Sequence, residues 1–297
     1  MHDDQDIKTA VRERYAGTAT AGSSCCGSGA GAAARTASIA GTVTVGGCCS
    51  GSATASPDRP MTSEEIGYAS ADLADIPEGA DLGLGCGNPL AVLELREGET
   101  VLDLGSGRGI DCFIAAKRVG PSGRVIGVDM TPEMIDRARR NAAAGDYPNV
   151  EFRLGEIEHL PVADGTVDAI ISNCVINLVP DKRQVFADAL RALRPGGRLS
   201  VSDIVLLGEV PVAIRDSVEA YVACLSGAVM RDDYLQMLRD AGFTDVEVTS
   251  EQRFTLDDVV SADLVEEYAR FVDGDRAALE DAASKFASVR VRAVKPS

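Results

Sequence analysis

Three of the eight cysteines lie in sequence contexts that suit a chemical role. Cys86 lies in a Gly-Cys-Gly-Asn-Pro loop, Cys174 directly follows Asn173 at the end of an apolar run, and Cys224 lies in the segment Tyr-Val-Ala-Cys-Leu-Ser-Gly. A chain of 297 residues with clear helix and strand patterns needs no disulfide scaffold, and in a reducing compartment such cysteines are more often metal-binding or catalytic. These three thiols are therefore candidate ligands or catalytic groups.

Each cysteine taken alone also fits a structural role, because free cysteine is often a small buried hydrophobic residue. Cys112 fits that role best, since it lies inside a predicted helix that we expect to pack against a sheet. Four more cysteines form two adjacent pairs, Cys25-Cys26 and Cys48-Cys49. Adjacent cysteines lack the Cys-x-x-Cys spacing of structural zinc sites, which disfavours a zinc site there.

A second group of candidate residues surrounds a glycine-rich turn, Asp-Leu-Gly-Ser-Gly-Arg-Gly at residues 103–109. Its glycines allow a tight turn and let a ligand lie close to the backbone. Asp129 follows about twenty residues later at the end of the next predicted strand, where a carboxylate can accept ribose hydroxyls. Glu156 and Ile157 follow the third strand, and Asn173 closes the fourth. These positions fall at carboxyl ends of strands, where open α/β sheets bind ligands.

The elements that must position these residues alternate between strand and helix. We predict strands at 101–104, 124–129, 150–154, 167–172, 199–205, 243–249 and 288–294, and helices at 7–16, 64–76, 110–119, 132–144 and 184–193. The run Pro195-Gly196-Gly197 predicts the turn that ends the last of these helices. Such alternation predicts an α/β fold with a mostly parallel sheet covered by helices on both faces.

Composition limits the function classes. A net charge of -17 would repel a polyanion, so we expect no nucleic-acid partner. No run approaches the roughly 20 apolar residues that cross a bilayer, and the acidic start is unlike a secretory signal, so we expect a cytoplasmic protein without a membrane partner. Residues 18–57 are rich in Gly, Ala, Ser and Thr, which predicts a flexible segment.

Three runs resemble the class I S-adenosylmethionine-dependent methyltransferases: Asp103-Leu-Gly-Ser-Gly, Gly127-Val-Asp129-Met and Leu193-Arg-Pro-Gly-Gly197. The resemblance implies a Rossmann-like, seven-stranded, mostly parallel sheet with an antiparallel last strand. An NAD-binding fold is disfavoured because Ile110 stands where its third glycine is expected. The cofactor implied is S-adenosylmethionine, and the residues expected to bind it are Asp103, Gly105, Ser106, Gly107, Asp129, Met130, Glu156, Ile157 and Asn173.

The cysteine contexts resemble a narrower family, the arsenite methyltransferases. Gly85-Cys86-Gly-Asn-Pro, the long run from Ser172 to Lys182 and the segment around Cys224 carry this resemblance. It implies that Cys86, Cys174 and Cys224 are the catalytic ligands of trivalent arsenic. A fourth family cysteine lies in the N-terminal region, and Cys48 or Cys49 is its expected counterpart, with Cys25 and Cys26 as competitors.

The chemistry of arsenic agrees with this residue set. Thiolates are soft ligands, and arsenic held by three of them keeps a lone pair that can attack a sulfonium methyl without a general base. The chain has two histidines, and we expect His159 to lie at the surface or behind the residues that touch the substrate, without a catalytic role. Methyl transfer oxidises arsenic, so a thiol reductant such as glutathione or thioredoxin is the expected co-substrate.

We expect a monomer with three parts: an N-terminal helix and cysteine-containing segment at 1–60, the cofactor-binding domain with the Cys86 loop at 61–206, and an arsenic-binding insert with the completing strands at 207–297. One alternative is a methyltransferase of a small organic molecule such as a quinone precursor, which needs no cysteine triad. A second is a non-catalytic metalloid- or zinc-binding protein.

Overall fold

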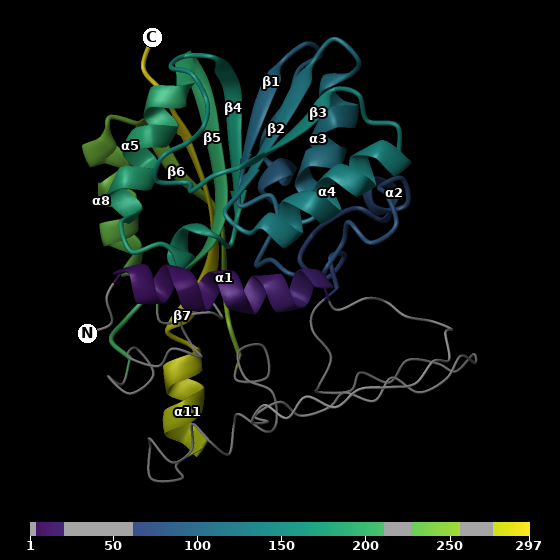
Figure 1. Cartoon of the computed structure of the whole chain (residues 1–297). Helices are drawn as coiled ribbons and strands as arrows, with labels where there is room; N and C mark the ends of the chain where they lie inside the picture. Colours follow the sequence, from purple (N-terminus) through teal and green to yellow (C-terminus); the bar gives the residue numbers. More distant parts are fainter. Residues whose placement is uncertain (1–3, 21–61, 211–226, 256–275) are drawn as a thin grey trace, which may run out of the picture.

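The computed structural model describes residues 4–20, 62–210, 227–255 and 276–297 (Figure 1). Its centre is a seven-stranded sheet with the order β3-β2-β1-β4-β5-β7-β6. Neighbouring strands from β3 to β5 are parallel, whereas β7 runs antiparallel to both β5 and β6. The predicted fold class is therefore confirmed. The strands are β1 (Thr100–Leu104), β2 (Arg124–Asp129), β3 (Val150–Leu154), β4 (Val167–Asn173), β5 (Leu193–Leu206), β6 (Thr244–Arg253) and β7 (Phe286–Val294).

Helices cover both faces of the sheet because the central strands are buried on both sides (Figure 1). One core layer packs α3 and α4 against the sheet, and the other packs α5 and α8 against the opposite face. The helices are α1 (Asp4–Thr20), α2 (Ser70–Leu73), α3 (Ile110–Val119), α4 (Pro132–Ala144), α5 (Lys182–Ala192), α8 (Arg231–Ala241) and α11 (Arg276–Ala283), with short 3-10 turns η1 (Pro89–Ala91) and η2 (Ile176–Leu178). Among the described helices, none combines the length and apolar character that a membrane span requires.

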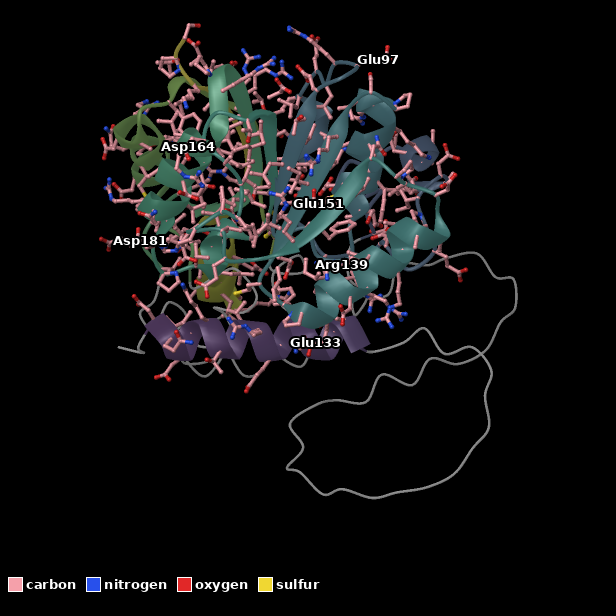
Figure 2. All side chains as sticks on the ribbon, turned by 45° about the horizontal axis from the view of Figure 1, so that its top comes forward. Glu97, Glu133, Arg139, Glu151, Asp164 and Asp181 are labelled. Atoms are coloured by element: carbon pink, nitrogen blue, oxygen red, sulfur yellow. The ribbon has the colours of Figure 1, made fainter. Side chains whose placement is uncertain are left out.

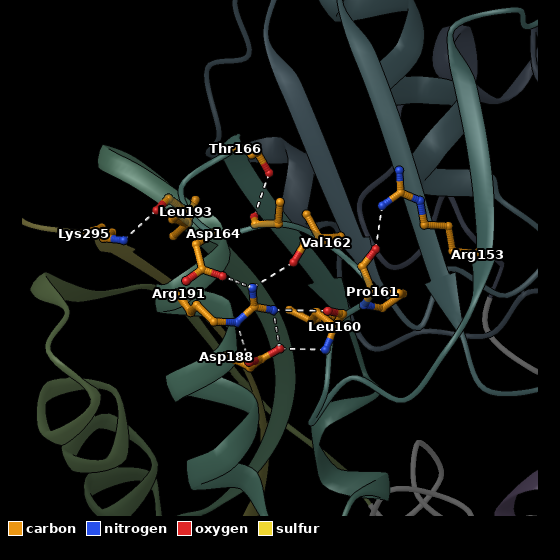
Figure 3. A network of polar contacts seen from close by, with 11 residues as sticks. Arg153, Leu160, Pro161, Val162, Asp164, Thr166, Asp188, Arg191, Leu193 and Lys295 are labelled. Atoms are coloured by element: carbon orange, nitrogen blue, oxygen red, sulfur yellow. Dashed lines mark hydrogen bonds and ion pairs between the residues drawn. The ribbon is translucent and has the colours of Figure 1, made fainter.

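Side-chain hydrogen bonds fix the outer elements to the sheet. Arg139 of α4 donates from Nε and Nη2 to the carbonyl oxygen of Phe152 in β3, at 3.2 and 2.9 Å (Figure 2). Arg191 in the last turn of α5 bonds Asp188 and the carbonyl oxygens of Leu160 and Val162 (Figure 3). The loop after β3, which carries Glu156 and Ile157, is thereby held against α5.

The helix predicted at 64–76 is wrong in its extent. Residues 63–67 form turns, and α2 begins only at Ser70. Gly67 adopts a left-handed conformation (φ 102°), and its carbonyl oxygen accepts a hydrogen bond from Asn88 Nδ2 at 3.0 Å. A helix through Gly67 would lose this contact, which ties the segment to the Cys86 loop.

The turn predicted at Pro195-Gly196-Gly197 is a distortion inside a longer strand. β5 already begins at Leu193, which pairs with Val167, and the register shifts before the next paired residue of β4. Gly196 has a positive φ of 74°, and its N–H donates to the carbonyl oxygen of Lys295 at 3.0 Å. Because the residue that follows β7 supplies this partner, the backbone stays in the sheet instead of turning out of it.

A pair of glycine substitutions tests the packing beneath the glycine-rich turn. Gly109 has φ 98°, and an added Cβ would lie 2.7 Å from Phe152 and 2.8 Å from Phe113. Gly165 has φ 63° and no heavy atom within 4 Å of an added Cβ. We expect Gly165→Ala to lower the free energy of unfolding by about 1 kcal/mol through backbone strain. Gly109→Ala should cost about 1–3 kcal/mol more through overpacking.

Urea unfolding of both variants measures the difference. Equal losses of stability would show that the two aromatic rings move aside without cost.

Candidate active site at the carboxyl edge of the sheet

The glycine-rich turn is held against the end of β2 by its own backbone. The N–H groups of Gly105 and Ser106 donate to the carbonyl oxygen of Val128 at 2.8 and 3.0 Å. Gly105 and Gly107 have φ values of 69° and 51°, and a Cβ on Gly105 would clash with Val175. Gly107 has no atoms within 4 Å of an added Cβ. The turn therefore presents bare backbone beside open space, which fits a ligand lying close to it.

Asp129 is positioned by two backbone donors. Its Oδ2 accepts from Gly107 N–H at 3.0 Å and its Oδ1 from Thr131 N–H at 2.8 Å. Burial raises the pKa of Asp129 and these hydrogen bonds lower it. A carboxylate has about four lone-pair sites, so both oxygens keep capacity for ribose hydroxyls. Ser106 Oγ, in the glycine-rich turn, is buried and has no hydrogen-bond partner among the described residues.

Asp103 lies beneath the turn. It is buried, and its Oδ2 accepts a hydrogen bond from Cys112 Sγ at 3.2 Å. Burial raises the pKa values of both groups well above their usual range. Cys112 is fully buried, so its predicted role as a core residue is confirmed. Asp103 would therefore affect a cofactor indirectly, by fixing the conformation of the glycine-rich turn above it.

Helix α1 lies across this edge of the sheet (Figure 1). Lys8 of α1 forms ion pairs with Glu156 at 2.6 Å and Glu158 at 3.1 Å. At the other end of the helix, Arg108 donates to the carbonyl oxygens of Thr18 and Ala19 at 2.9 and 2.8 Å. The two carbonyl oxygens lie in the last turn of α1, where the helix dipole favours a cation such as Arg108. The sequence predicted a helix here but gave no signal of where it docks.

Three of the predicted cofactor residues thus have protein partners. Glu156 pairs with α1, Ile157 is buried in the core cluster that includes α5, and Met130 packs against the cluster that contains Cys86 and Val11. Their contacts with a cofactor stay predictions. Their common location at the carboxyl edge agrees with the expected site.

Asn173 joins the Cys86 loop to the end of β4. Its Nδ2 donates to Tyr68 Oη at 2.9 Å and to the carbonyl oxygen of Gly87 at 2.7 Å, and its Oδ1 accepts from Cys86 N–H at 3.2 Å. Tyr68 Oη donates in turn to Asp111 at 2.8 Å. The predicted role of Asn173 in holding a cofactor stays a prediction. Its observed role is to place Cys86 beside Cys174, and Tyr68 was not foreseen as a partner.

Cys86 and Cys174 meet at this edge together with Asp203 of β5. The two sulfurs and a carboxylate oxygen of Asp203 all lie within 4.8 Å of one another. Cys174 has a φ of 56°, a left-handed conformation that costs a non-glycine residue about 1–3 kcal/mol. Its N–H donates to the carbonyl oxygen of Ser202 at 2.8 Å, which fixes the strained residue at the end of the sheet. The predicted meeting of these two thiols is seen in the structure.

Asp203 is a further acidic group that sequence reasoning missed. It is 1% exposed, and burial raises its pKa to about 7, although the charge of Lys182 opposes this. Its Oδ2 accepts from Tyr234 Oη at 3.2 Å and its Oδ1 from Ile204 N–H at 3.0 Å. An acidic residue inside the otherwise buried run of β5 was the available signal.

The other predicted cysteine ligands cannot be placed. Cys224 and the N-terminal cysteines Cys25, Cys26, Cys48 and Cys49 lie outside the described residues. His159 is exposed, as expected. Within the described part of the chain, the edge therefore offers two soft thiols, one carboxyl group of raised pKa and a glycine-rich cradle.

Comparison with known proteins agrees with this geometry. Residues 95–242 match the family described as a methyltransferase domain. The chain is 47% identical over 253 residues to an arsenite methyltransferase of Halobacterium salinarum, covering 85% of this chain and 61% of that protein. It is 41% identical over 194 residues to an arsenite methyltransferase of Aquipseudomonas alcaligenes, covering 63% and 56%. The chain thus spans less than two thirds of the length of these relatives.

Among solved structures, an arsenic(III) S-adenosylmethionine methyltransferase from Chlamydomonas reinhardtii superposes with a TM-score of 0.60. It is 33% identical, and the match covers 77% of this chain and 71% of that one. A phosphoethanolamine N-methyltransferase of Haemonchus contortus, solved with S-adenosyl-L-methionine, is 20% identical with a TM-score of 0.54 over 72% of this chain and 54% of its own, and shows the fold alone. On identity and coverage together, this chain belongs to the arsenic(III) S-adenosylmethionine methyltransferases.

Proposed function

We propose that this protein transfers methyl groups from S-adenosylmethionine to trivalent arsenic held by Cys86, Cys174 and Cys224, as a step in arsenic detoxification. The observation that carries the proposal is the approach of the Cys86 and Cys174 sulfurs to within 4.8 Å at the carboxyl edge. Thiolates are the protein ligands best matched to a soft centre. The names of the relatives, and the methyltransferase-domain match that includes the glycine-rich turn, support the same activity.

The residues that would hold the cofactor are Gly105, Ser106, Gly107 and Asp129. The fit rests on the bare backbone of the turn, on Ser106 Oγ, which has no partner within the described residues, and on the remaining lone-pair capacity of the Asp129 carboxylate. S-adenosylmethionine supplies an electrophilic methyl group on a positively charged sulfur. Helix α1 covers the edge and limits access of water to it, since Val11 is 1% exposed in the same cluster as Cys86.

The protein's contribution to the reaction is mostly positioning. Arsenic bound by three thiolates forms the new As–C bond with its lone pair as the methyl–sulfur bond breaks, so the acceptor atom releases no proton. Holding two reactants in attack geometry can supply about 7–11 kcal/mol of the barrier. The thiols must lose their protons when arsenic binds. Transfer leaves arsenic formally pentavalent, and a thiol reductant, glutathione or thioredoxin in our proposal, returns it to the trivalent state.

We further propose that the protein is cytoplasmic and monomeric, and that the N-terminal cysteines deliver arsenic or act as a local reductant. Helix α1 supports this last role, because it ends at Thr20 beside Arg108 of the glycine-rich turn. Ala19, six positions before Cys25 in the sequence, therefore contacts the glycine-rich turn.

Replacement of each ligand tests the three-thiolate site. We expect Cys86→Ser, Cys174→Ser and Cys224→Ser each to lower methylation of arsenite by more than about 100-fold, because a hydroxyl is a poor ligand for a soft centre. Binding of S-adenosylmethionine, measured by calorimetry, should stay near that of the parent. Cys112→Ser is the matched control and should keep methylation. If Cys174→Ser or Cys224→Ser turned over arsenite at the parental rate, the site would be wrong.

The same assay separates the alternatives. Incubation with arsenite, labelled cofactor and thiol gives labelled methylarsenic only if arsenic is the acceptor. One equivalent of zinc without cofactor binding would instead support a zinc-binding protein.

A variant with serine at all four N-terminal cysteines tests their role without removing α1. We expect it to lose more activity on inorganic arsenite than on an already methylated trivalent substrate. The reason is that delivery of arsenic by the N-terminal cysteines matters most before the first methyl group is added. Product speciation by mass spectrometry measures both. Equal activity of variant and parent on both substrates would exclude a relay.

The raised pKa of Asp203 predicts a pH dependence of stability. The folded protein holds this proton to about pH 7, whereas an unfolded Asp releases it near its usual pKa of 3.8. The contribution of the protonated group is therefore present below about pH 4 and is lost as the pH rises through 7. Relative to Asp203→Asn, the parent without arsenic should lose up to about 4 kcal/mol of stability over this range.

Urea unfolding at several pH values measures this difference. The exposed Glu94→Gln variant corrects for general effects of charge. Parallel stability curves for the parent and Asp203→Asn would show that the carboxyl group titrates normally.

A further inference from the structure

A small cavity lies behind Cys86, between its loop and strands β5, β7 and β6. It has a volume of about 30 Å³, and we name it the Arg290 pocket after its charged residue. The residues that line it and carry the argument are Cys86, Ser202, Ser250, Gln252, Ser288 and Arg290. Ser288 Oγ also donates a hydrogen bond to the carbonyl oxygen of Cys86. The cavity is therefore directly joined to one of the arsenic ligands but plays no part in the chemistry described above.

Two polar atoms in the pocket have no hydrogen-bond partner within the described residues. Ser202 is 1% exposed, and its Oγ is buried with no hydrogen-bond partner within the described residues. The Nε of Arg290 is also buried and unbonded within the same part of the chain. Buried polar groups are normally paired, so each such group indicates an absent ligand or water. Both donors line one cavity, which indicates a shared acceptor.

The charge of Arg290 narrows the nature of that acceptor. Burial lowers the pKa of Arg290, which shows that its positive charge is partly desolvated. Within the described residues no carboxylate forms an ion pair with it, whereas Arg292 on the same strand pairs with Glu247 and Arg198 pairs with Glu99. The rim residue Glu65 instead accepts a hydrogen bond from Thr62 N–H at 2.7 Å. A partly desolvated cation that no described carboxylate neutralises favours an anionic ligand.

The size and the position of the cavity further limit which molecules can bind in it. A volume of 30 Å³ holds about two waters or one carboxylate group, but not a whole metabolite. Ser250 and Gln252 on its rim are exposed, so a longer molecule can extend out of it. A ligand with its anionic end at Arg290 and its other end near Cys86 would carry a carboxylate and a group that meets arsenic.

We propose that the Arg290 pocket binds the carboxylate of a small thiol that carries arsenic to the site. This inference rests on the proposed function. In the exchange, the bond between arsenic and the carrier sulfur breaks as the bond between arsenic and Cys86 forms, and the Cys86 proton leaves on the released carrier thiol. Arg290 and Ser202 hold the carboxylate during this step, with Ser250 and Gln252 at the opening.

A pair of isosteric thiols tests the proposal. Arsenite is supplied with an excess of either 3-mercaptopropionate or its neutral amide, 3-mercaptopropionamide, and kcat/KM for arsenic is measured. We expect the parent to favour the carboxylate thiol about tenfold, as one charge-assisted pair allows. Arg290→Gln should reduce the preference to about twofold or less, mainly through KM. The matched control Arg292→Gln, which removes a paired arginine from the same strand, should keep it. A parent without preference, or a preference that survives Arg290→Gln, would overturn the proposal.

A binding measurement without arsenic keeps the test independent of the proposed activity. We expect propionate to raise the melting temperature of the parent and of Arg292→Gln but not of Arg290→Gln or the smaller change Ser202→Ala. Inorganic phosphate serves as the second probe. Stabilisation by phosphate and not by propionate would assign the pocket to a free oxoanion and overturn the thiol carrier. Loss of methylation with every thiol, together with Arg290-dependent binding of propionate, would instead contradict the proposed function alone.

Discussion

The arrangement of the site depends on the amide of Asn173. It lies at the end of β4, and its three hydrogen bonds reach Tyr68, Gly87 and the backbone of Cys86. These bonds hold a loop that precedes the sheet in sequence against the residue that follows a central strand. Two thiols separated by 88 positions in the chain thereby meet. A Cβ on Gly85 would lie 2.9 Å from this amide, so the loop approaches it as closely as glycine permits.

Much of the frame could be predicted from sequence because its signals are local. Strand and helix periods, the glycines of the turn and Pro132 at the start of α4 act within a few residues of themselves, and the predicted strands β1 to β4 agree closely with those observed. Errors arose where a distant partner decides the backbone. Gly67 ends a turn because Asn88 binds it, and Gly196 stays in β5 because Lys295 supplies a carbonyl.

The candidate site divides in the same way. Cysteines can be chosen from their contexts, whereas Asp203, Tyr68 and Arg108 act through contacts with residues far along the chain. Sequence alone also gave no docking position for α1, whose pattern is only weakly amphipathic and whose place is set by ion pairs to Glu156 and Glu158. Whether a charged side chain is buried depends on the tertiary structure, so the hydrophobic periodicity of a single segment does not predict it.

Charge balance links the thiol site to the pocket behind it. Arsenic(III) with three thiolates is electrically neutral, and Asp203 keeps its proton to about pH 7, so the site we propose for arsenic would need no counter-ion. Arg290 therefore cannot be explained as the cation that neutralises those thiolates. Its guanidinium is partly desolvated and forms no ion pair within the described residues, so it still favours an anion. The carboxylate of a carrier thiol would supply this anion only while the carrier is bound. Arg290 therefore favours binding of the carrier before its arsenic is transferred to Cys86.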